Sequence, residues 1–594
     1  MTRARLRAAF AAALALAACT PGAPREQAPV RLFPDVRPFT VGSDTRLGLV
    51  LHEQRPSAVA TVLLPEAAEL SFGYAVNAAV REEGNERVEA SQLAPVVLAL
   101  TLVHKDGTRE PILEQRLDPK LAKDRRWVDA SADLSRFQGE TVELEFAMRP
   151  EPGGVPPIAA FWEPTLHSAG ARDARPNLLV VSIDTLRARN VGAYGHTRDT
   201  TPFLDELAAG GVLFENAITT AATTGPAHMS LFTGLYPVHH GIRGGHEPRR
   251  PGAVPLAVWL RDAGYHTAAF TENGYIIRGL GFGDGFSEYS ENTGAKGSVP
   301  GEARVTFERA RRWLARSRRQ PFLLFVHTYQ VHAPYAPPPE TAKLFQDDDA
   351  PGTPSAELRP QHDNYDREIR FVDGQLRELV AALDAQGLRA STTLVVLSDH
   401  GEEFGEHGYF QHGTALYEES LRVPLVWSGK DIPAGRRVAE QVSLIDVMPT
   451  LLALAGVAAP KGVDGESLLP AMHGETLPER TLFAEADAPG RWKKPFFRES
   501  WNPVLVAVRS QHGKMLIHRP VHGEAAPPQR FDLDADALER APQPLDGDDL
   551  ASAERQVDGY LNGRGPDGSP PAPAPEPELD PELRERLEAL GYIP

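Results

Sequence analysis

Acidic side chains directly follow two apolar segments of this 594-residue chain, and they suggest its first possible chemistry. Ser182-Ile183-Asp184 closes one apolar run, and Ser398-Asp399-His400-Gly401 closes another. An acid behind a buried strand emerges at the open edge of a sheet, where it can bind a ligand. A carboxylate beside the imidazole of His400 is a donor set that suits Mn²⁺ or Zn²⁺. Each acid alone could simply cap the next helix, so it is their joint occurrence that favours a metal site.

Thr224 is the candidate nucleophile. The segment Thr223-Thr224-Gly225-Pro226-Ala227-His228 precedes a mostly apolar stretch, and its proline suits the first turn of a helix. Free backbone N–H groups and the helix dipole would favour an anionic oxygen there. A hydroxyl held beside a metal could lose its proton and attack an electrophile. The alternative, which the local sequence alone favours, is an ordinary threonine cap.

The segments that must position these residues alternate between short apolar runs and amphipathic helices. We expect a helix from Thr201-Pro202 to Gly210-Gly211 and another over Tyr365–Ala385. Four apolar runs are typical of strands buried on both faces: Leu178–Ile183, Thr267–Phe270, Phe322–Val326 and Leu394–Leu397. This alternation predicts an α/β fold with a doubly wound sheet, whose ligands bind at the carboxyl ends of its strands.

Other regions flank this sheet. Residues 32–168 predict a β-sandwich domain, because Val96–Val103 is rich in Leu and β-branched residues and Val142–Met148 alternates apolar with mostly polar side chains. Trp127 and Trp162 could stack on sugar rings, but buried core positions are the more common fate of such rings. We expect the catalytic domain over 175–477, a smaller α+β subdomain over 478–565, and a Pro-rich linker with a terminal helix over 566–594.

The N-terminus indicates export and lipidation. Basic Met1–Arg7 precedes apolar Ala8–Ala18, which is too short to cross a ~30 Å hydrocarbon core but fits a secretory signal. Leu16-Ala17-Ala18-Cys19 resembles the lipobox of bacterial lipoproteins, which implies cleavage after residues 1–18 and diacylation of Cys19. Residues 19–31 would form an extended tether. We expect a protein of the bacterial cell envelope, lipid-anchored to a membrane through Cys19 and facing the periplasm or the exterior; the alternative is an ordinary signal peptide with a chance cysteine.

Composition excludes several classes of protein. The chain has 62 basic and 80 acidic residues, a net charge of -18, 42% hydrophobic residues and a single Cys. Wholesale disorder and a disulfide scaffold are therefore excluded. We expect no nucleic-acid partner, because an acidic surface repels the phosphate backbone.

Several segments, in order, resemble motifs of the sulfatase family within the alkaline phosphatase superfamily. The likeness covers about residues 176–594 and not the predicted β-sandwich. The matching segments are Ile183–Leu186, Gly192–Gly195, Thr224–His228, Leu231–Pro237, Val331–Tyr335, Leu397–Gly401, Tyr417–Leu425, Asp446–Leu451, Asp464–Leu469 and Leu590–Tyr592. The resemblance implies an alkaline-phosphatase/sulfatase-like doubly wound sheet.

The chain departs from that family at the nucleophile. Family sulfatases carry Cys or Ser at the place of Thr224, which is converted to formylglycine. Threonine cannot give that aldehyde, because its β-carbon bears a methyl group. His228 stands where the family has Arg, and Thr185 where it has a second Asp.

The remaining metal set resembles the single-metal site of superfamily members that transfer or hydrolyse phosphoryl groups through a threonine alkoxide. It consists of Asp184, Thr224, Asp399 and His400. It implies one divalent ion, Mn²⁺ or Zn²⁺ rather than Ca²⁺, which prefers many oxygen ligands.

These residues suggest a mechanism on an anionic ester. Thr224 attacks, while His228 and His332 offset charge on the equatorial oxygens. His412, near the place of a family Lys, protonates the leaving group. His327 and His407 lie in the same segments, and we expect both to be bystanders.

Three functions remain open at this point. The first is hydrolysis or transfer of a phosphate ester, and the second is hydrolysis of a sulfate ester without formylglycine. In either case the ester could be linked to a glycan or a lipid. The third is a non-catalytic surface lipoprotein whose β-sandwich binds glycan. The joint presence of Asp184, Asp399, His400 and His332 counts against the third.

Overall fold

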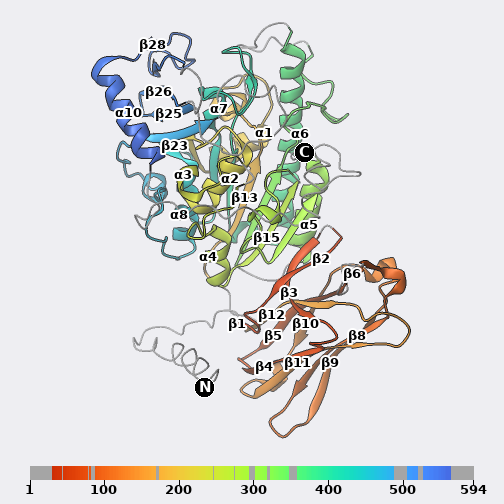
Figure 1. Cartoon of the computed structure of the whole chain (residues 1–594). Helices are drawn as coiled ribbons and strands as arrows, with labels where there is room; N and C mark the ends of the chain where they lie inside the picture. Colours follow the sequence, from red (N-terminus) through yellow and green to blue (C-terminus); the bar gives the residue numbers. More distant parts are fainter. Residues whose placement is uncertain are drawn as a thin grey trace, which may run out of the picture.

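The computed structural model describes residues 30–42, 44–77, 79–81, 87–168, 173–244, 247–272, 274–292, 302–316, 321–346, 357–486, 505–519 and 526–562. An N-terminal β-module lies below a larger α/β region in Figure 1. The expected signal peptide, Cys19, the Pro-rich linker and the terminal helix lie outside the described residues. Within these ranges, no helix is both long and apolar enough to cross a membrane.

The centre of the α/β region is a parallel sheet built from the four predicted apolar runs. Its strands lie in the order β15 (His266–Glu272), β17 (Phe322–Thr328), β13 (Asn177–Ile183) and β18 (Thr392–Leu397). All four are buried along their whole length. Beyond β18, the strands β22 (Leu425–Gly429) and β14 (Val212–Ile218) extend the sheet in antiparallel pairs.

Helices cover both faces of this sheet, which confirms the doubly wound α/β prediction. Leu179 and Val181 of β13 pack in one core with α1 (Pro202–Ala209), α5 (Ala303–Arg316) and α6 (Arg359–Ala385). Leu178 and Val180 pack in the opposite core with α2 (Thr224–Thr233), α4 (Leu256–Asp262) and α8 (Val447–Leu454). The predicted helix ending before Gly210 is confirmed as α1. Helix α6 begins at Arg359 and not at Tyr365. The prediction missed its first turns because they are polar and carry no apolar periodicity.

The N-terminal module is a sandwich of two antiparallel sheets, as predicted. One four-stranded sheet has the order β4 (Ser57–Leu63), β11 (Thr141–Pro150), β8 (Val96–Val103) and β9 (Arg109–Leu117). Facing it are β10 (Val128–Asp133), β5 (Ala68–Val76), β12 (Ala159–Ser168) and β3 (Asp44–Leu51). Leu98 and Phe146 of the first sheet meet Phe72 and Phe161 of the second. Trp127 and Trp162 are buried, which favours the core interpretation.

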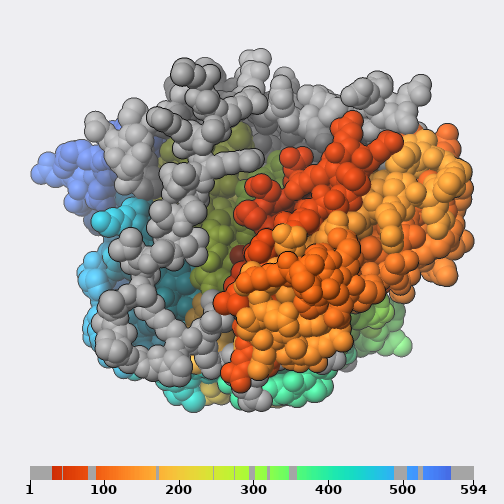
Figure 2. Space-filling view, turned by 90° about the horizontal axis from the view of Figure 1, so that it is seen from below, coloured from red at the N-terminus to blue at the C-terminus, as the bar shows by residue number. Residues whose placement is uncertain are grey.

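The module is joined to the catalytic sheet by backbone hydrogen bonds. Strand β3 pairs antiparallel with β16 (Glu288–Asn292), which pairs parallel with β15, so a single sheet of 15 strands runs through both parts. In Figure 2 the red and orange module lies directly against the green part of the α/β region. The sequence analysis did not predict this continuity.

The described residues after Pro478 form a small sheet and a helix. The five-stranded antiparallel sheet has the order β24 (Leu482–Ala486), β25 (Leu505–Arg509), β26 (Gly513–His518), β27 (Gln529–Asp532) and β28 (Gln543–Pro544). Helix α10 (Gly547–Leu561) packs Val557 and Tyr560 against Val506 and Ile517 of this sheet.

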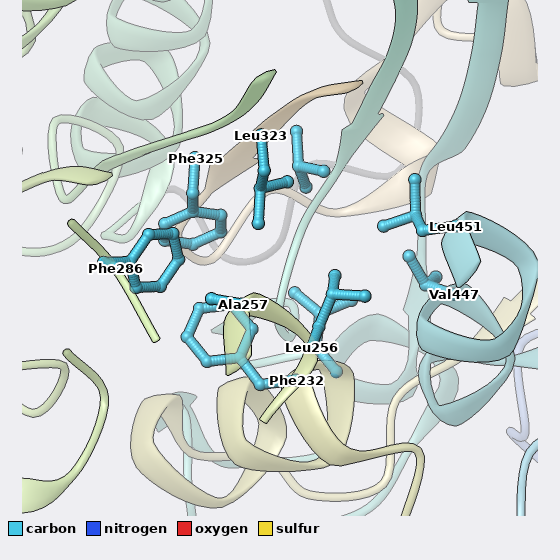
Figure 3. Close-up of a pocket in the computed structure, with 10 residues that line it drawn as sticks. Phe232, Leu256, Ala257, Phe286, Leu323, Phe325, Val447 and Leu451 are labelled. Atoms are coloured by element: carbon cyan, nitrogen blue, oxygen red, sulfur yellow. The ribbon is translucent and has the colours of Figure 1, made fainter. Parts of the chain in front are cut away.

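A small cavity under α2 and α4 is too apolar and too small to be a substrate site. It has a volume of about 10 Å³, which is room for about one water. Figure 3 shows the rings of Phe232, Phe286 and Phe325 on one side and Val447 and Leu451 on the other, all carbon atoms. No side chain that lines this cavity carries a polar group.

Candidate active site

The carboxyl ends of β13 and β18 bring the predicted metal ligands together. Because these strands are adjacent and parallel, Asp184 and Asp399 emerge side by side. Ligand atoms of Asp184, Asp399 and His400 all lie within 4.8 Å of one another, and all three residues are buried. Thr224, the first residue of α2, places its Oγ1 3.3 Å from Asp184 Oδ2 and 3.4 Å from His400 Nε2.

The donor atoms of this cluster fit a divalent metal. Asp184 Oδ1 and Asp399 Oδ2 are buried and have no hydrogen-bond partner among the described residues. Such oxygens are costly unless a cation or a proton satisfies them. His400 Nδ1 donates to the carbonyl of Gly401 at 2.9 Å, which leaves the lone pair of Nε2 free for a ligand. Two carboxylates, one imidazole and a hydroxyl suit Mn²⁺ or Zn²⁺.

The pKa values of the two carboxyl groups also favour a metal site. Burial raises the pKa of Asp184 well above its usual value, and the neighbouring Asp399 raises it further. Burial would also raise the pKa of Asp399, but the imidazoles of His400, His228 and His327 hold it at about 2. Two carboxyl groups this close cannot both stay ionised without a positive partner, so the site favours a bound cation.

Thr185 contributes its backbone and not a ligand. Its φ of +57° is unusual for a β-branched residue, and local strain of this kind is often found at functional sites. In this conformation its N–H donates to Asp399 Oδ1 at 3.3 Å, while its hydroxyl donates to the carbonyl of Val331 at 3.1 Å. The hydroxyl is thus engaged away from the ligand atoms.

His228 lies behind the cluster. Its Nδ1 donates to the carbonyl of Thr224 at 2.9 Å and lies 3.4 Å from Asp399 Oδ2. Its Nε2 lies 3.0 Å from Ser182 Oγ, which donates to it in the neutral imidazole. Both ring nitrogens therefore contact protein atoms. This arrangement favours a role in orienting Thr224 and Asp399.

His327 is a site residue that the sequence analysis treated as a bystander. It is completely buried near the end of β17, beside Ser182 of β13. Its Nε2 lies 3.4 Å from Asp184 Oδ2, and its ring centre is 4.9 Å from that of His228. A histidine near the end of a buried strand, next to a ligand-bearing strand, was the signal that could have revealed it.

His332 and His412 lie beside the ligand cluster and are less buried than its members. The ring of His412 is centred 4.5 Å from His400 and 4.9 Å from His332. Burial lowers the pKa of both His332 and His412 to about 4. A negative group beside either imidazole favours its protonated form and opposes this shift.

His407 lies apart from these groups. Its ring stacks on Tyr417 at 3.7 Å, and its Nδ1 contacts Glu419 at 2.5 Å. These contacts are consistent with the bystander role expected for it.

Comparison with known proteins agrees with this geometry. Residues 176–457 match the family model described as Sulfatase. An uncharacterized sulfatase, YidJ, from Escherichia coli strain K12 is 29% identical over 355 residues, which are 50% of this chain and 71% of that protein. The multifunctional alkaline phosphatase superfamily protein PehA from Trinickia caryophylli is 28% identical over 476 residues, which are 61% of this chain and 90% of that protein.

A solved structure shows the same fold. The phosphonate monoester hydrolase of Agrobacterium radiobacter superposes with a TM-score of 0.53 and 22% identity, covering 65% of this chain and 95% of that one. The family model spans the strands and helices that carry Asp184, Thr224, Asp399 and His400. Residues 176–457 therefore form a region that matches the sulfatase family and contains all four candidate metal-site residues.

Proposed function

We propose that the chain is a metal-dependent hydrolase of phosphate esters that uses Thr224 as its nucleophile. The observation that supports this most directly is the position of Thr224 Oγ1, within 3.3–3.4 Å of Asp184 and His400. This position supports a reactive role for the hydroxyl. The N-cap position of α2 is occupied by Thr223 and not by Thr224, so the ordinary cap interpretation does not apply to Thr224.

The chain's own residues prepare this attack. Asp184, Thr224, Asp399 and His400 would hold the metal, which supplies a lowered pKa for the Thr224 hydroxyl and offsets negative charge on the substrate. The N-terminus of α2 adds the positive end of its dipole at Thr224. His332 and His412 face the entering ester. His228 fixes Thr224 through the backbone carbonyl of that residue.

Thr224 favours phosphate over sulfate on chemical grounds. Formylglycine releases sulfate by breaking its own C–O bond, and threonine cannot form that aldehyde. A threonine phosphate can be hydrolysed by attack at phosphorus, whereas attack at sulfur in a threonine sulfate is slow. The PehA relative is described as multifunctional, which keeps sulfate ester hydrolysis as the second candidate.

We also propose where the enzyme works. The lipobox-like segment ending at Cys19 would anchor it in the bacterial cell envelope. There the substrate would be an anionic ester on a glycan or a lipid headgroup. The β-module would then act mainly as a rigid support, because its tryptophans are buried.

Activity assays with defined esters test this function. Purified protein loaded with Mn²⁺ or Zn²⁺ is assayed on aryl phosphate, aryl phosphodiester and aryl sulfate. We expect turnover of a phosphate ester to exceed that of sulfate, and Thr224→Ala to lose at least about 10³-fold in kcat, while Thr224→Ser keeps a hydroxyl and most of the rate. Faster turnover of sulfate, or oxidation of Thr224 in the intact peptide mass, would refute the phosphoesterase proposal. No turnover and no bound metal would favour the non-catalytic lipoprotein.

A further inference from the structure

A buried carboxylate that the sequence analysis did not single out contacts the predicted general acid. Glu402 is completely buried, and both of its carboxylate oxygens have partners. Oε1 lies 2.8 Å from Nδ1 of His412, and Oε2 accepts a hydrogen bond from the hydroxyl of Tyr335 at 2.8 Å. A fully partnered carboxylate behind an imidazole is the arrangement that fixes ring orientation in enzymes that move protons.

The backbone places Glu402 at this point because of Gly401. The N–H of Gly401 donates to the carbonyl of Ser420, and a Cβ on Gly401 would lie 1.9 Å from the carbonyl oxygen of Glu419. Only glycine allows this close approach, which carries the chain from the metal ligand His400 to Glu402. The hydroxyl of Tyr335 is fixed in turn, since its ring packs against Phe404 at 5.5 Å.

His412 is suitably placed to hand a proton to a leaving group. Its Nδ1 is engaged by Glu402, so Nε2 is the nitrogen left for substrate. No described residue bonds to Nε2, and the side chain keeps 15% of its surface exposed. Its ring is in contact with both His400 of the ligand cluster and His332.

We propose that Tyr335, Glu402 and His412 form a proton-handling relay, in which His412 is the general acid and Glu402 and Tyr335 are positioning residues. The proposal rests on the proposed ester hydrolysis. The hydrogen bond between Glu402 Oε1 and Nδ1 fixes the ring of His412 so that its Nε2 is directed at the leaving oxygen. Tyr335 holds that carboxylate in place by occupying its second oxygen.

The proposed reaction has two steps, formation and hydrolysis of a bond between Thr224 and phosphorus. The alkoxide of Thr224, whose proton has gone to solvent, forms a bond to phosphorus, and the bond from phosphorus to the leaving oxygen breaks. That oxygen takes the proton from Nε2 of His412, which becomes neutral. Water then gives a proton to Nε2 as it attacks phosphorus, and the bond to Thr224 breaks to restore the alkoxide and the imidazolium.

Leaving-group dependence distinguishes this relay from a structural role. A poor leaving group such as phenol needs the proton, whereas 4-nitrophenol leaves without much help. We expect Glu402→Gln to lower kcat/KM for phenyl phosphate by about 10²-fold and for 4-nitrophenyl phosphate by less than about tenfold. His412→Asn should show the same pattern, and Tyr335→Phe a weaker one in the same direction.

Glu403→Gln is the matched control. Glu403 is the next residue, is equally buried, and bonds to the hydroxyl of Ser420 and not to an active-site imidazole. Metal content and thermal unfolding are measured for every variant. As a readout independent of activity, the downfield proton NMR signal of His412 Nδ1–H should be present in the wild type and in Glu403→Gln but lost in Glu402→Gln.

The outcomes decide both proposals separately. Equal loss on both leaving groups, or no difference between Glu402→Gln and Glu403→Gln, would overturn the relay while leaving Thr224 chemistry intact. Phenyl and 4-nitrophenyl sulfates are run in parallel. If only sulfates are turned over, the proposed phosphate preference is wrong. The relay is then tested by comparing Glu402→Gln on phenyl sulfate and on 4-nitrophenyl sulfate. Turnover of neither ester overturns both.

Discussion

At the scale of single residues, the proposed chemistry depends on the methyl group of Thr224. It blocks formation of an aldehyde, yet the hydroxyl keeps its place between Asp184 Oδ2 and His400 Nε2. His228, which stands where the resemblance places a family arginine, is completely buried. Under the proposed function, these residues would provide a metal site and a nucleophile without formylglycine.

His327 should control metal affinity through Asp184. Its Nε2 lies 3.4 Å from Asp184 Oδ2, so it can orient that ligand without reaching the metal itself. We expect His327→Asn to weaken metal binding by about 10–100-fold, as the loss of a partner of a metal ligand commonly does. Metal titration followed by thermal shift measures the change.

The control for this variant is His239→Asn. His239 also bonds a carboxylate, Asp464, at 2.7 Å, but in α3 (Pro237–His240), outside the ligand cluster. Equal metal affinity in the two variants would show that His327 does not act on Asp184.

The sequence predicts ligands better than the residues that support them. Asp184 and Asp399 could be identified because each directly follows an apolar strand, and Thr224 because a proline marks its helix start. Glu402 has no such sequence signal, and the only signal for His327 is its position near the end of an apolar strand. Their importance arises from contacts with His412 and Asp184 that only the folded chain brings together.

Helix α6 is the element that holds the His332 loop. Glu368 of this helix accepts hydrogen bonds from the side chain of Gln330 at 3.1 Å and from the N–H of Ala336 at 3.0 Å. These two residues lie on either side of His332 along the chain. Burial raises the pKa of Glu368 from 4.5 to about 8.

This raised pKa predicts a loss of stability with rising pH. Between about pH 4.5 and 8 the folded state keeps a proton that the unfolded state has lost, so the free energy of unfolding falls as pH rises. The side chain of Glu368→Gln stays neutral at every pH. Between pH 5 and pH 9, we expect the free energy of unfolding of this variant to rise relative to that of the wild type by on the order of 2–4 kcal/mol. Urea unfolding at both pH values measures this. The exposed Glu378→Gln, in the same helix, should follow the wild type; an equal pH slope in Glu368→Gln would contradict the assignment.

The element that the sequence analysis missed is the pairing of β3 with β16. Glu288–Asn292 is polar, so it carries neither the apolar run of a buried strand nor a clean alternation. The strand is buried because β3 covers its outer edge and because Glu288 has basic partners, Arg46 and Arg316. The four central strands were predictable for the opposite reason, since burial on both faces made them continuously apolar.

At the scale of the whole molecule, a single guanidinium sits at the junction of module and catalytic sheet. Arg46 of β3 is 1% exposed and contacts Asp129 at 2.5 Å within the module and Glu288 at 3.5 Å across the junction. Its charged group lies over the rings of Trp162 at 4.5 Å and Trp127 at 5.2 Å. The module is therefore an extension of the catalytic sheet fixed by a buried ion pair.

Removing Arg46 should loosen this junction. Arg46→Ala removes the ion pair between Arg46 and Glu288 and leaves the Glu288 side chain buried. We therefore expect the free energy of unfolding to fall by about 3–5 kcal/mol. Hydrogen exchange should speed up at the paired amides of β3 and β16, including the N–H of Leu47 that bonds Ser287. The control Arg116→Ala removes an exposed pair with Glu151 in the same module and should cost about 0–1 kcal/mol. If both variants cost the same and exchange at β16 is unchanged, then Arg46 does not join the two parts, and the backbone pairing of β3 with β16 is sufficient to hold them.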